Sequence, residues 1–272
     1  MDTWGEPLSI IRSGLLEKAG VPHGFGTVNT VSSELPSPIF TLQQVHGNRI
    51  VVISDPTDHV NRAMVSDPLS EAGEEAKLTI YSVPEQPVRF TEGDALISNV
   101  SGIFIGIRTA DCLPVLLADP RSGTAAAVHC GWRSLALGIA GEAVRTVSAL
   151  SGNPSPEFLA ALGPAIGPCC YEVGQEVQKA LEHLPGFQAA FIRKKERLFM
   201  DLAAAARAQL LAAGIPGENM DVMENCTSCG KERFFSHRAR RDEGRMISFV
   251  GARPNAPGRA AGAQQASRRR RR

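Results

Sequence analysis

Two short apolar runs joined by a turn constrain the fold of this chain more than any other feature. Residues 113–128, LPVLLADPRSGTAAAV, place apolar residues on both sides of DPRSG, where a proline follows an aspartate and a glycine closes the turn. This pattern predicts a β-hairpin. A turn centred near Arg121 sets Cys112 opposite residue 130, within one position, and so brings Cys112 close to His129.

The pairing of Cys112 with His129 allows three interpretations. Free cysteine is often buried like a small hydrophobe, so packing is the first. A thiolate beside an imidazole can also be a nucleophile with its base, or part of a metal site that needs at least a third ligand. A helix predicted just after His129 would add partial positive charge near Cys112 and favour its thiolate, while Cys130 should face the other way. The residues alone leave all three interpretations open.

An arginine-rich C-terminus hides the charge of the rest of the chain. The net charge of the 272 residues is +1, but residues 256–272 contain six arginines and no acid. Without them, 23 basic residues stand against 28 acidic ones, so specific nucleic-acid binding is not expected. We predict a folded domain over residues 1–255 and a disordered tail over residues 256–272.

The sequence also predicts a compartment. No apolar run approaches the roughly 20 residues of a membrane span. The N-terminus lacks a basic start followed by a continuous apolar region. We therefore expect a cytoplasmic protein without a membrane partner, whose six cysteines remain reduced.

Local patterns predict an α+β fold. Strand-like runs occur at 43–54, 94–99, 103–109, 113–119, 124–130, near 220–225 and at 245–252, and residues 158–174 read as a strand followed by a Gly/Pro loop. Helical patterns occur at 8–20, 134–150, 173–184 and 200–213. Residues 30–41 have the composition of a loop, and 54–92 that of a long exposed excursion. The elements follow no regular βαβ repeat, which favours mixed sheets over a Rossmann fold.

Six segments resemble, in the same order, the laccase-domain family. They are QQVHGN, DALIS, RTADCLPVLLAD, AAVHCGWRSLALGI, LGPAIGPCCYEVG and CTSCGKERFFSHRARRDEGRMISFVG, within about residues 21 to 253. This family is also called multicopper polyphenol oxidoreductase, peptidoglycan editing factor or purine nucleoside phosphorylase. The resemblance implies a single domain of mixed β-sheets flanked by helices, with αββα-type layering.

The resemblance also implies a zinc site and an activity. Its metal ligands correspond to His46, Cys112 and His129 of this chain, a set of nitrogen and sulfur donors that suits Zn²⁺, with copper possible. The implied reactions are phosphorolysis of adenosine, inosine and methylthioadenosine to free base and (methylthio)ribose 1-phosphate, and deamination of adenosine. For the second reaction, zinc would lower the pKa of a water to about 7 and yield a hydroxide that attacks the purine. The expected partners are a small nucleoside and phosphate, and the expected state is a monomer or homodimer.

Further residues are candidates for substrate contact. Phosphate needs a cationic pocket, and Arg108, Arg133 and Arg238 are the arginines that we expect there. Asp111 is a candidate catalytic proton carrier or a partner of the metal ligands, although an aspartate at a turn is as often structural. His23 and His237 are weaker pocket candidates. Family members commonly have FSTR near the N-terminus; Val28 stands in place of that arginine here, so any role of the arginine is lost or taken by another residue.

Two alternative activities and one alternative metal site remain. A metal-free Cys–His hydrolase or amidase that edits peptidoglycan precursors is compatible with Cys112 and His129. A copper-dependent polyphenol oxidoreductase is disfavoured, because a multicopper site is built largely from imidazoles and the chain has six histidines and no His-x-His pair. Cys226 and Cys229 form a C-x-x-C, but with Cys169 and Cys170 they make a poor tetrahedral set, so no metal is expected there.

Overall fold

Strands buried along their whole length form the centre of the molecule. The structure, a computed structural model, describes residues 9–54, 78–82 and 91–252. Its largest sheet has the order β14-β10-β8-β9-β6-β4-β5. The bounds are β4 Ile50–Ser54, β5 Leu78–Ser82, β6 Ala95–Ser98, β8 Leu113–Ala118, β9 Ala125–Cys130, β10 Leu159–Leu162 and β14 Met220–Val222. Strands β4, β6, β8 and β9 are buried at every residue because both faces of this sheet are covered.

A second sheet covers one of those faces. Its order is β1-β2-β15-β7-β3, with β1 Ile10–Ile11, β2 His23–Gly26, β3 Ile39–Thr41, β7 Phe104–Thr109 and β15 Met246–Gly251. Side chains of both sheets, such as Phe25, Leu96 and Ile105, form one apolar cluster between them. Both sheets contain parallel and antiparallel pairs, which confirms the expected α+β fold with mixed sheets.

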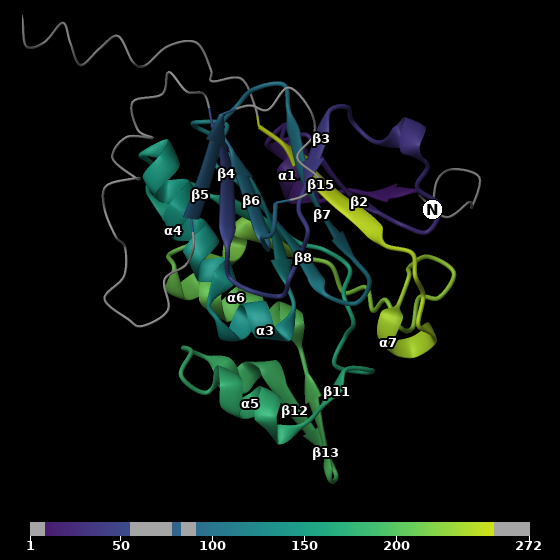
Figure 1. Cartoon of the computed structure of the whole chain (residues 1–272). Helices are drawn as coiled ribbons and strands as arrows, with labels where there is room; N and C mark the ends of the chain where they lie inside the picture. The colour runs from purple at the N-terminus through teal and green to yellow at the C-terminus, as the bar shows by residue number, and fades with distance from the viewer. Residues whose placement is uncertain (1–8, 55–77, 83–90, 253–272) are drawn as a thin grey trace, which may run out of the picture.

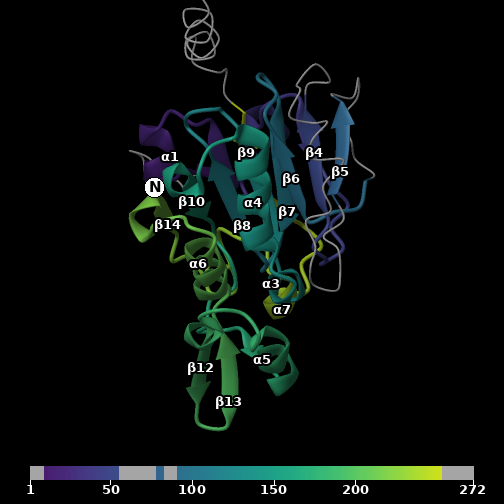
Figure 2. The same ribbon diagram turned by 90° about the vertical axis from the view of Figure 1, so that its left-hand side faces the viewer.

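Helices cover the other face of the seven-stranded sheet (Figure 2). They are α3 Trp132–Ala136, α4 Ile139–Ser151 and α6 Leu202–Ala212, and their apolar side chains join those of the sheet in a second cluster. The remaining α-helices of the described residues are α1 Gly14–Lys18, α5 Gln175–Leu181 and α7 His237–Arg240. Short 3₁₀ helices occur at Ser32–Glu34, Ser155–Glu157, Phe187–Ala190 and Gly217–Asn219.

A small sheet extends away from the two large ones (Figure 1). It contains β11 Glu172–Val173, β12 Phe191–Lys194 and β13 Arg197–Met200, in the order β11-β13-β12. No strand was expected here, because the β12–β13 turn lacks the Asn-Gly or Asp-Gly pair that usually marks a tight hairpin. Instead, Lys195 adopts the positive φ of 54° itself.

Three expected elements differ in detail. The helix predicted over 134–150 is two helices, because Gly138 has a φ of 75° and separates α3 from α4. The N-terminal helix is shorter than expected, since β1 precedes it and the Ser13 side chain caps α1. The predicted loop over 30–41 ends in β3, which pairs with β7.

The hairpin and most other predicted strands are confirmed. The observed β8–β9 register pairs Leu113 with Cys130 and Pro114 with His129, one position from the predicted centre. Most of the excursion at 54–92 and the tail at 256–272 lie outside the described residues, so the domain boundary at 255 stays a prediction. No helix within residues 9–54, 78–82 and 91–252 is long and apolar enough to cross a membrane.

Candidate active site

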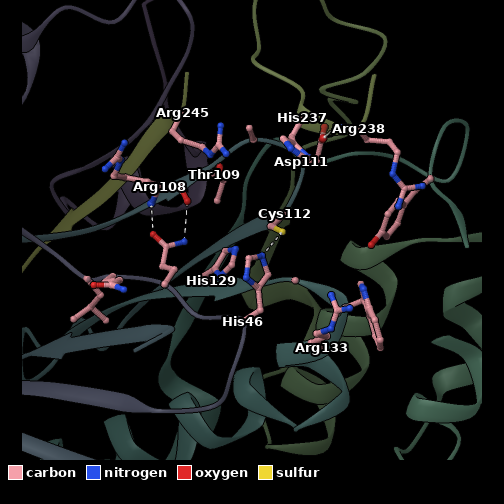
Figure 3. Close-up of a pocket in the computed structure, with 17 residues that line it drawn as sticks. His46, Arg108, Thr109, Asp111, Cys112, His129, Arg133, His237, Arg238 and Arg245 are labelled. Carbon is pink, nitrogen blue, oxygen red and sulfur yellow. Dashed lines mark hydrogen bonds between the residues drawn. The ribbon is translucent and has the colours of Figure 1, made fainter. Parts of the chain in front are cut away.

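The end of the β8–β9 hairpin brings a thiol and two imidazoles together. Cys112 directly precedes β8 and His129 is the penultimate residue of β9, so antiparallel pairing sets them side by side. The metal-binding atoms of His46, Cys112 and His129 all lie within 4.8 Å of one another (Figure 3). Cys130 faces the apolar cluster under the helices, as the alternation of a strand requires. The predicted contact between Cys112 and His129 is therefore confirmed.

His46 reaches this point from the loop between β3 and β4. Its Nε2 lies 3.9 Å from Cys112 Sγ, and its ring centroid lies 4.8 Å from that of His129. The His46 backbone has a φ of 60°, a left-handed conformation that costs a non-glycine residue about 1–3 kcal/mol. Such a conformation persists only where its surroundings hold it, and one carboxylate provides that support.

The supporting carboxylate belongs to Asp94, which the sequence analysis missed. The fully buried Asp94 accepts hydrogen bonds from the backbone N–H groups of His46 and Gly47, at 2.9 and 2.7 Å. Its Oδ1 also lies 2.7 Å from His129 Nδ1. With Nδ1 engaged in this way, Nε2 of His129 is the nitrogen left to bind a metal. Asp94 thus orients two of the three candidate ligands.

The electrostatics of the pair favour a charged thiolate beside a charged imidazole. Burial alone would raise the pKa of the Cys112 thiol, but His129, and then His46, outweigh it and lower that pKa to about 6. Burial would likewise lower the pKa of His129, but Cys112 and Asp94 raise it to about 9. The helix N-terminus that we expected to act on Cys112 belongs to α3, which has only five residues. The neighbouring histidines are the source of the shift.

These three donors fit a zinc ion. Zinc binds imidazole nitrogen at about 2.0–2.1 Å and thiolate at about 2.3 Å, so a tetrahedral site separates N and S ligands by about 3.5 Å. The 3.9 Å between His46 and Cys112 is close to this value. Gly131 leaves the necessary room, since a Cβ there would lie 3.1 Å from His46 Cδ2 and 3.3 Å from Cys112 Sγ. Three protein ligands leave a fourth position, and here the ligands line an open pocket.

The pocket beside the ligands has a volume of about 590 Å³ and is lined by arginines. Arg108, Arg133 and Arg238 all contribute to its wall, as predicted, and Arg245 joins them (Figure 3). These cations come from β7, α3, α7 and the segment before β15. His237 also lines the pocket. The ends of four elements thus concentrate positive charge around the ligand cluster.

Aromatic rings hold two of these arginines. The Arg133 guanidinium lies 4.4 Å from the centroid of the Trp132 ring, and that of Arg238 lies 4.9 Å from the Tyr171 ring. Arg238 Nη1 also donates a hydrogen bond of 2.7 Å to the Glu172 carbonyl oxygen. These contacts fix both guanidinium groups at the pocket wall.

Comparison with known proteins identifies the family. A family model described as multi-copper polyphenol oxidoreductase laccase matches residues 27–253. The chain belongs to this family. In the solved structure of YlmD from Geobacillus stearothermophilus, the matched part covers 92% of this chain and 98% of YlmD, with a TM-score of 0.71 and 27% identity.

Two curated relatives of this laccase family carry enzyme names. The purine nucleoside phosphorylase YlmD of Geobacillus stearothermophilus is 39% identical over 164 residues, which are 59% of this chain and 60% of that relative. The adenosine deaminase RL5, from an unknown prokaryotic organism, is 36% identical over 159 residues, 57% of this chain and 60% of the relative. The match thus spans less than two thirds of either relative.

Asp111 lies at the pocket wall in a strained conformation, with a φ of 89°. Its Oδ1 accepts a hydrogen bond of 2.7 Å from Thr227 Oγ1, and its Oδ2 accepts one of 2.6 Å from the backbone N–H of Arg238. Both carboxylate oxygens are therefore used in holding the segment that carries Arg238. One oxygen thus binds the turn that contains Thr227 and the other binds the start of α7, beside the pocket.

Two other sequence candidates lie elsewhere. His23 is fully buried; its Nδ1 lies 2.8 Å from the Val21 carbonyl oxygen, and its Nε2 accepts a hydrogen bond from the Ser13 N–H. It does not line the pocket, so its role is structural. Val28, the position at which the resemblance led us to expect an arginine, donates its backbone N–H to the Arg233 carbonyl oxygen and also lies outside the pocket wall.

The four remaining cysteines contradict our expectation of a poor ligand set. Cys169, Cys170, Cys226 and Cys229 have their sulfur atoms within 4.8 Å of one another. Two loops that are about 60 residues apart in the sequence meet there, and no local pattern shows such a meeting. Of the histidines in the described residues, only His46 and His129 enter a potential metal-binding group, too few for the multicopper centre that the family name suggests.

Proposed function

We propose that this protein is a zinc-dependent purine nucleoside enzyme. It would cleave adenosine, inosine and methylthioadenosine with phosphate to free base and (methylthio)ribose 1-phosphate, and deaminate adenosine. The observation that carries the proposal is the open His46–Cys112–His129 set facing a pocket with four arginines. The names of the relatives YlmD and RL5 support the same substrate class.

Each ligand has a distinct place in the proposed centre. Bound zinc would supply a Lewis acid that activates a water for attack on the purine ring or polarises a substrate oxygen. Cys112 contributes the thiolate, and His46 and His129 contribute imidazole nitrogens. Asp94 holds His129 by its Nδ1 and His46 by its backbone, so both rings are oriented before substrate binds.

Different side chains of the pocket suit the phosphate and the nucleoside. In phosphorolysis a phosphate oxygen bonds to C1′ of the ribose, the C1′–N bond breaks, and the departing base nitrogen takes up a proton. Arg108, Arg133 and Arg238 are suited to hold the anion, because guanidinium binds phosphate in a bidentate manner. Tyr171 and Trp132 offer ring faces against which a purine can stack.

We place this activity in the cytoplasm, in a monomer or homodimer, with a domain spanning 1–255. The proposed substrates are small metabolites. A gel-filtration measurement with light scattering tests the oligomeric state directly.

A metal-free Cys–His hydrolase is the second candidate. The lowered pKa of Cys112, about 6, and the raised pKa of His129 are what a nucleophile and its base would show. A nucleophile with its base needs only Cys112 and His129, whereas a metal site needs a third donor, and His46 supplies it. For this reason the zinc enzyme is the better-supported function.

The deciding experiment is product analysis on zinc-loaded protein. Adenosine and inosine are incubated with and without phosphate, and products are separated by chromatography, with Cys112→Ala as the control. Hypoxanthine and ribose 1-phosphate should form from inosine only with phosphate, and inosine should form from adenosine without it. Absence of turnover on every nucleoside would refute the proposal. Amidase activity that survives zinc removal would instead support the hydrolase.

A further inference from the structure

Four thiols from two loops form a cluster outside the pocket. Cys169 and Cys170 lie in the turn between β10 and β11, and Cys226 and Cys229 lie between β14 and α7. The sulfur of Cys229 lies 3.7 Å from that of Cys169 and 3.4 Å from that of Cys170. None of these cysteines lines the pocket that contains His46, Cys112 and His129.

The spacing of the sulfur atoms is that of a metal site. A disulfide joins its sulfurs at about 2.05 Å, far shorter than either distance. Four thiolates around zinc at about 2.3 Å form a tetrahedron whose edges are about 3.8 Å long. The observed 3.4 and 3.7 Å lie near that edge length, and all four atoms lie within 4.8 Å of one another. The thiols are therefore placed to surround one ion.

The backbone around the cluster is built to hold it. Gly167 donates its N–H to Cys226 Sγ at 3.3 Å, a bond that favours a charged sulfur. Gly167 is also sterically confined, because a Cβ there would lie 3.3 Å from Cys226 Cβ and 3.4 Å from Cys169 Sγ. In the C-x-x-C turn, Gly230 donates its N–H to the Cys226 carbonyl at 2.9 Å. Two backbone hydrogen bonds join the loops: the Ala165 N–H donates to the Asn225 carbonyl oxygen, and the Thr227 N–H donates to the Ala165 carbonyl oxygen.

Charge and exposure also suit a bound ion. Lys194 Nζ lies 3.5 Å from the Pro168 carbonyl oxygen, and Arg240 Nη1 lies 3.5 Å from that of Ser228. These two cations flank a site that would be negative once four thiolates surround a divalent ion. Cys169 and Cys229 are exposed, so an ion can reach the cluster from solvent.

We propose that Cys169, Cys170, Cys226 and Cys229 bind one zinc ion as a closed structural site. Zinc suits a tetrahedral set of four sulfur ligands, and a set without an open position is typical of structural sites. On binding, the thiols release their protons to solvent and the four thiolates complete the coordination shell. The chain would then carry two zinc ions of different kinds.

The closed site would brace one wall of the pocket. Thr227 lies inside the C-x-x-C turn and donates its hydroxyl hydrogen to Asp111. Asp111 in turn accepts the N–H of Arg238, and Tyr171 directly follows Cys170 and contacts the Arg238 guanidinium. An ion that ties the two loops together would therefore fix Tyr171 and Arg238 at the pocket.

Metal analysis of matched variants tests the proposal without reference to activity. The wild-type protein, purified with its thiols reduced, should carry two zinc ions per chain by elemental analysis. Both Cys112→Ala and the double variant Cys226→Ser/Cys229→Ser should carry one. Ser228→Ala, which changes a side chain within the same turn but no ligand, should retain two. A double variant with the same zinc content as the wild type would overturn the proposal.

Cobalt substitution keeps the test decisive if the double variant fails to fold. In Cys112→Ala loaded with Co²⁺, four-thiolate coordination should give intense sulfur-to-cobalt charge-transfer bands, and the single variant Cys169→Ser should weaken them. Absence of these bands would contradict the proposal. Stoichiometric iron with sulfide, or a disulfide detected by intact mass before reduction, would also overturn it.

Discussion

The two sulfur-containing clusters differ in what surrounds them, and the difference distinguishes a candidate catalytic site from a candidate structural site. The cluster of His46, Cys112 and His129 has three donors of mixed type, a buried carboxylate behind it and an arginine-lined pocket in front. The cluster of four cysteines has four donors of one type and joins two loops. Open sites with three protein ligands are typical of catalysis, and closed sites with four are typical of structure.

The largest expected effect is that variants of the two clusters change different properties, one mainly the activity and the other mainly the melting temperature. Cys112→Ala should lower nucleoside turnover more than about 100-fold. Even the loss of a group that only hydrogen-bonds to a metal ligand lowers metal affinity or activity about 10–100-fold. The melting temperature of Cys112→Ala should change little. Cys226→Ser/Cys229→Ser should act mainly on stability, with a large loss of melting temperature. Its loss of activity per folded molecule should be much smaller than that of Cys112→Ala, because Tyr171 and Arg238 lose only their support at the pocket wall. Equal effects of both variants on activity and melting temperature would contradict the division.

Replacement of the carboxylate behind the open cluster should have the next largest effect. Asp94→Asn removes the charge that orients His129 and holds the His46 backbone, so zinc affinity should fall about 10–100-fold. Competition with a chromogenic chelator measures this affinity.

Asp119 provides the matched control for Asp94. It is a buried carboxylate at the other end of the same hairpin, and it accepts hydrogen bonds from Ser122 and Asn153. Asp119→Asn should lower stability without changing zinc affinity. If both variants bind zinc equally well, Asp94 has no role in orienting the ligands.

These residues also show how far the sequence leads. The hairpin at 113–128 was predictable because its turn and its apolar runs are local, and the contact between Cys112 and His129 follows from strand pairing alone. His46 came only from the family resemblance, since nothing local links it to the hairpin. Asp94 was missed because its role depends on four hydrogen bonds with residues that are distant in the sequence. The cysteine cluster was misjudged for the same reason: C-x-x-C is visible locally, but its meeting with Cys169 and Cys170 depends on how β10 and β14 are placed.

Cys112 should differ in reactivity from Cys169 and Cys229 once metal is removed. Burial raises the pKa of Cys112, but His129 and His46 lower it to about 6, so above pH 6 the thiolate form dominates. Burial raises the pKa of Cys169, and neighbouring thiols raise that of Cys229. Alkylation at pH 7 should therefore modify Cys112 about tenfold faster than Cys169 or Cys229. This figure already allows for the lower nucleophilicity of a low-pKa thiolate.

Peptide mass spectrometry of metal-free protein that retains its native circular dichroism measures these rates. The rate at Cys112 should rise with pH through about 6 and then level off, while Cys169 and Cys229 continue to gain. Zinc should protect Cys112. Faster alkylation of the exposed Cys169 and Cys229 at pH 7 would show that exposure, not the histidines, controls reactivity.

The smallest expected effect tests the space around the open cluster. In Gly131→Ala the new methyl group would lie 3.1 Å from His46 Cδ2 and 3.3 Å from Cys112 Sγ, closer than ordinary contacts. Gly131 has a φ of −77°, so alanine is compatible with the backbone and the effect is confined to the ligands. We expect zinc affinity to fall a few-fold as His46 shifts, with no change in zinc at the four-cysteine cluster. Gly14→Ala, where a Cβ meets nothing within 4 Å, should leave both sites unchanged. Unchanged zinc affinity in Gly131→Ala would mean that His46 can move aside freely, and that the open cluster is less rigidly held than the contacts of Asp94 indicate.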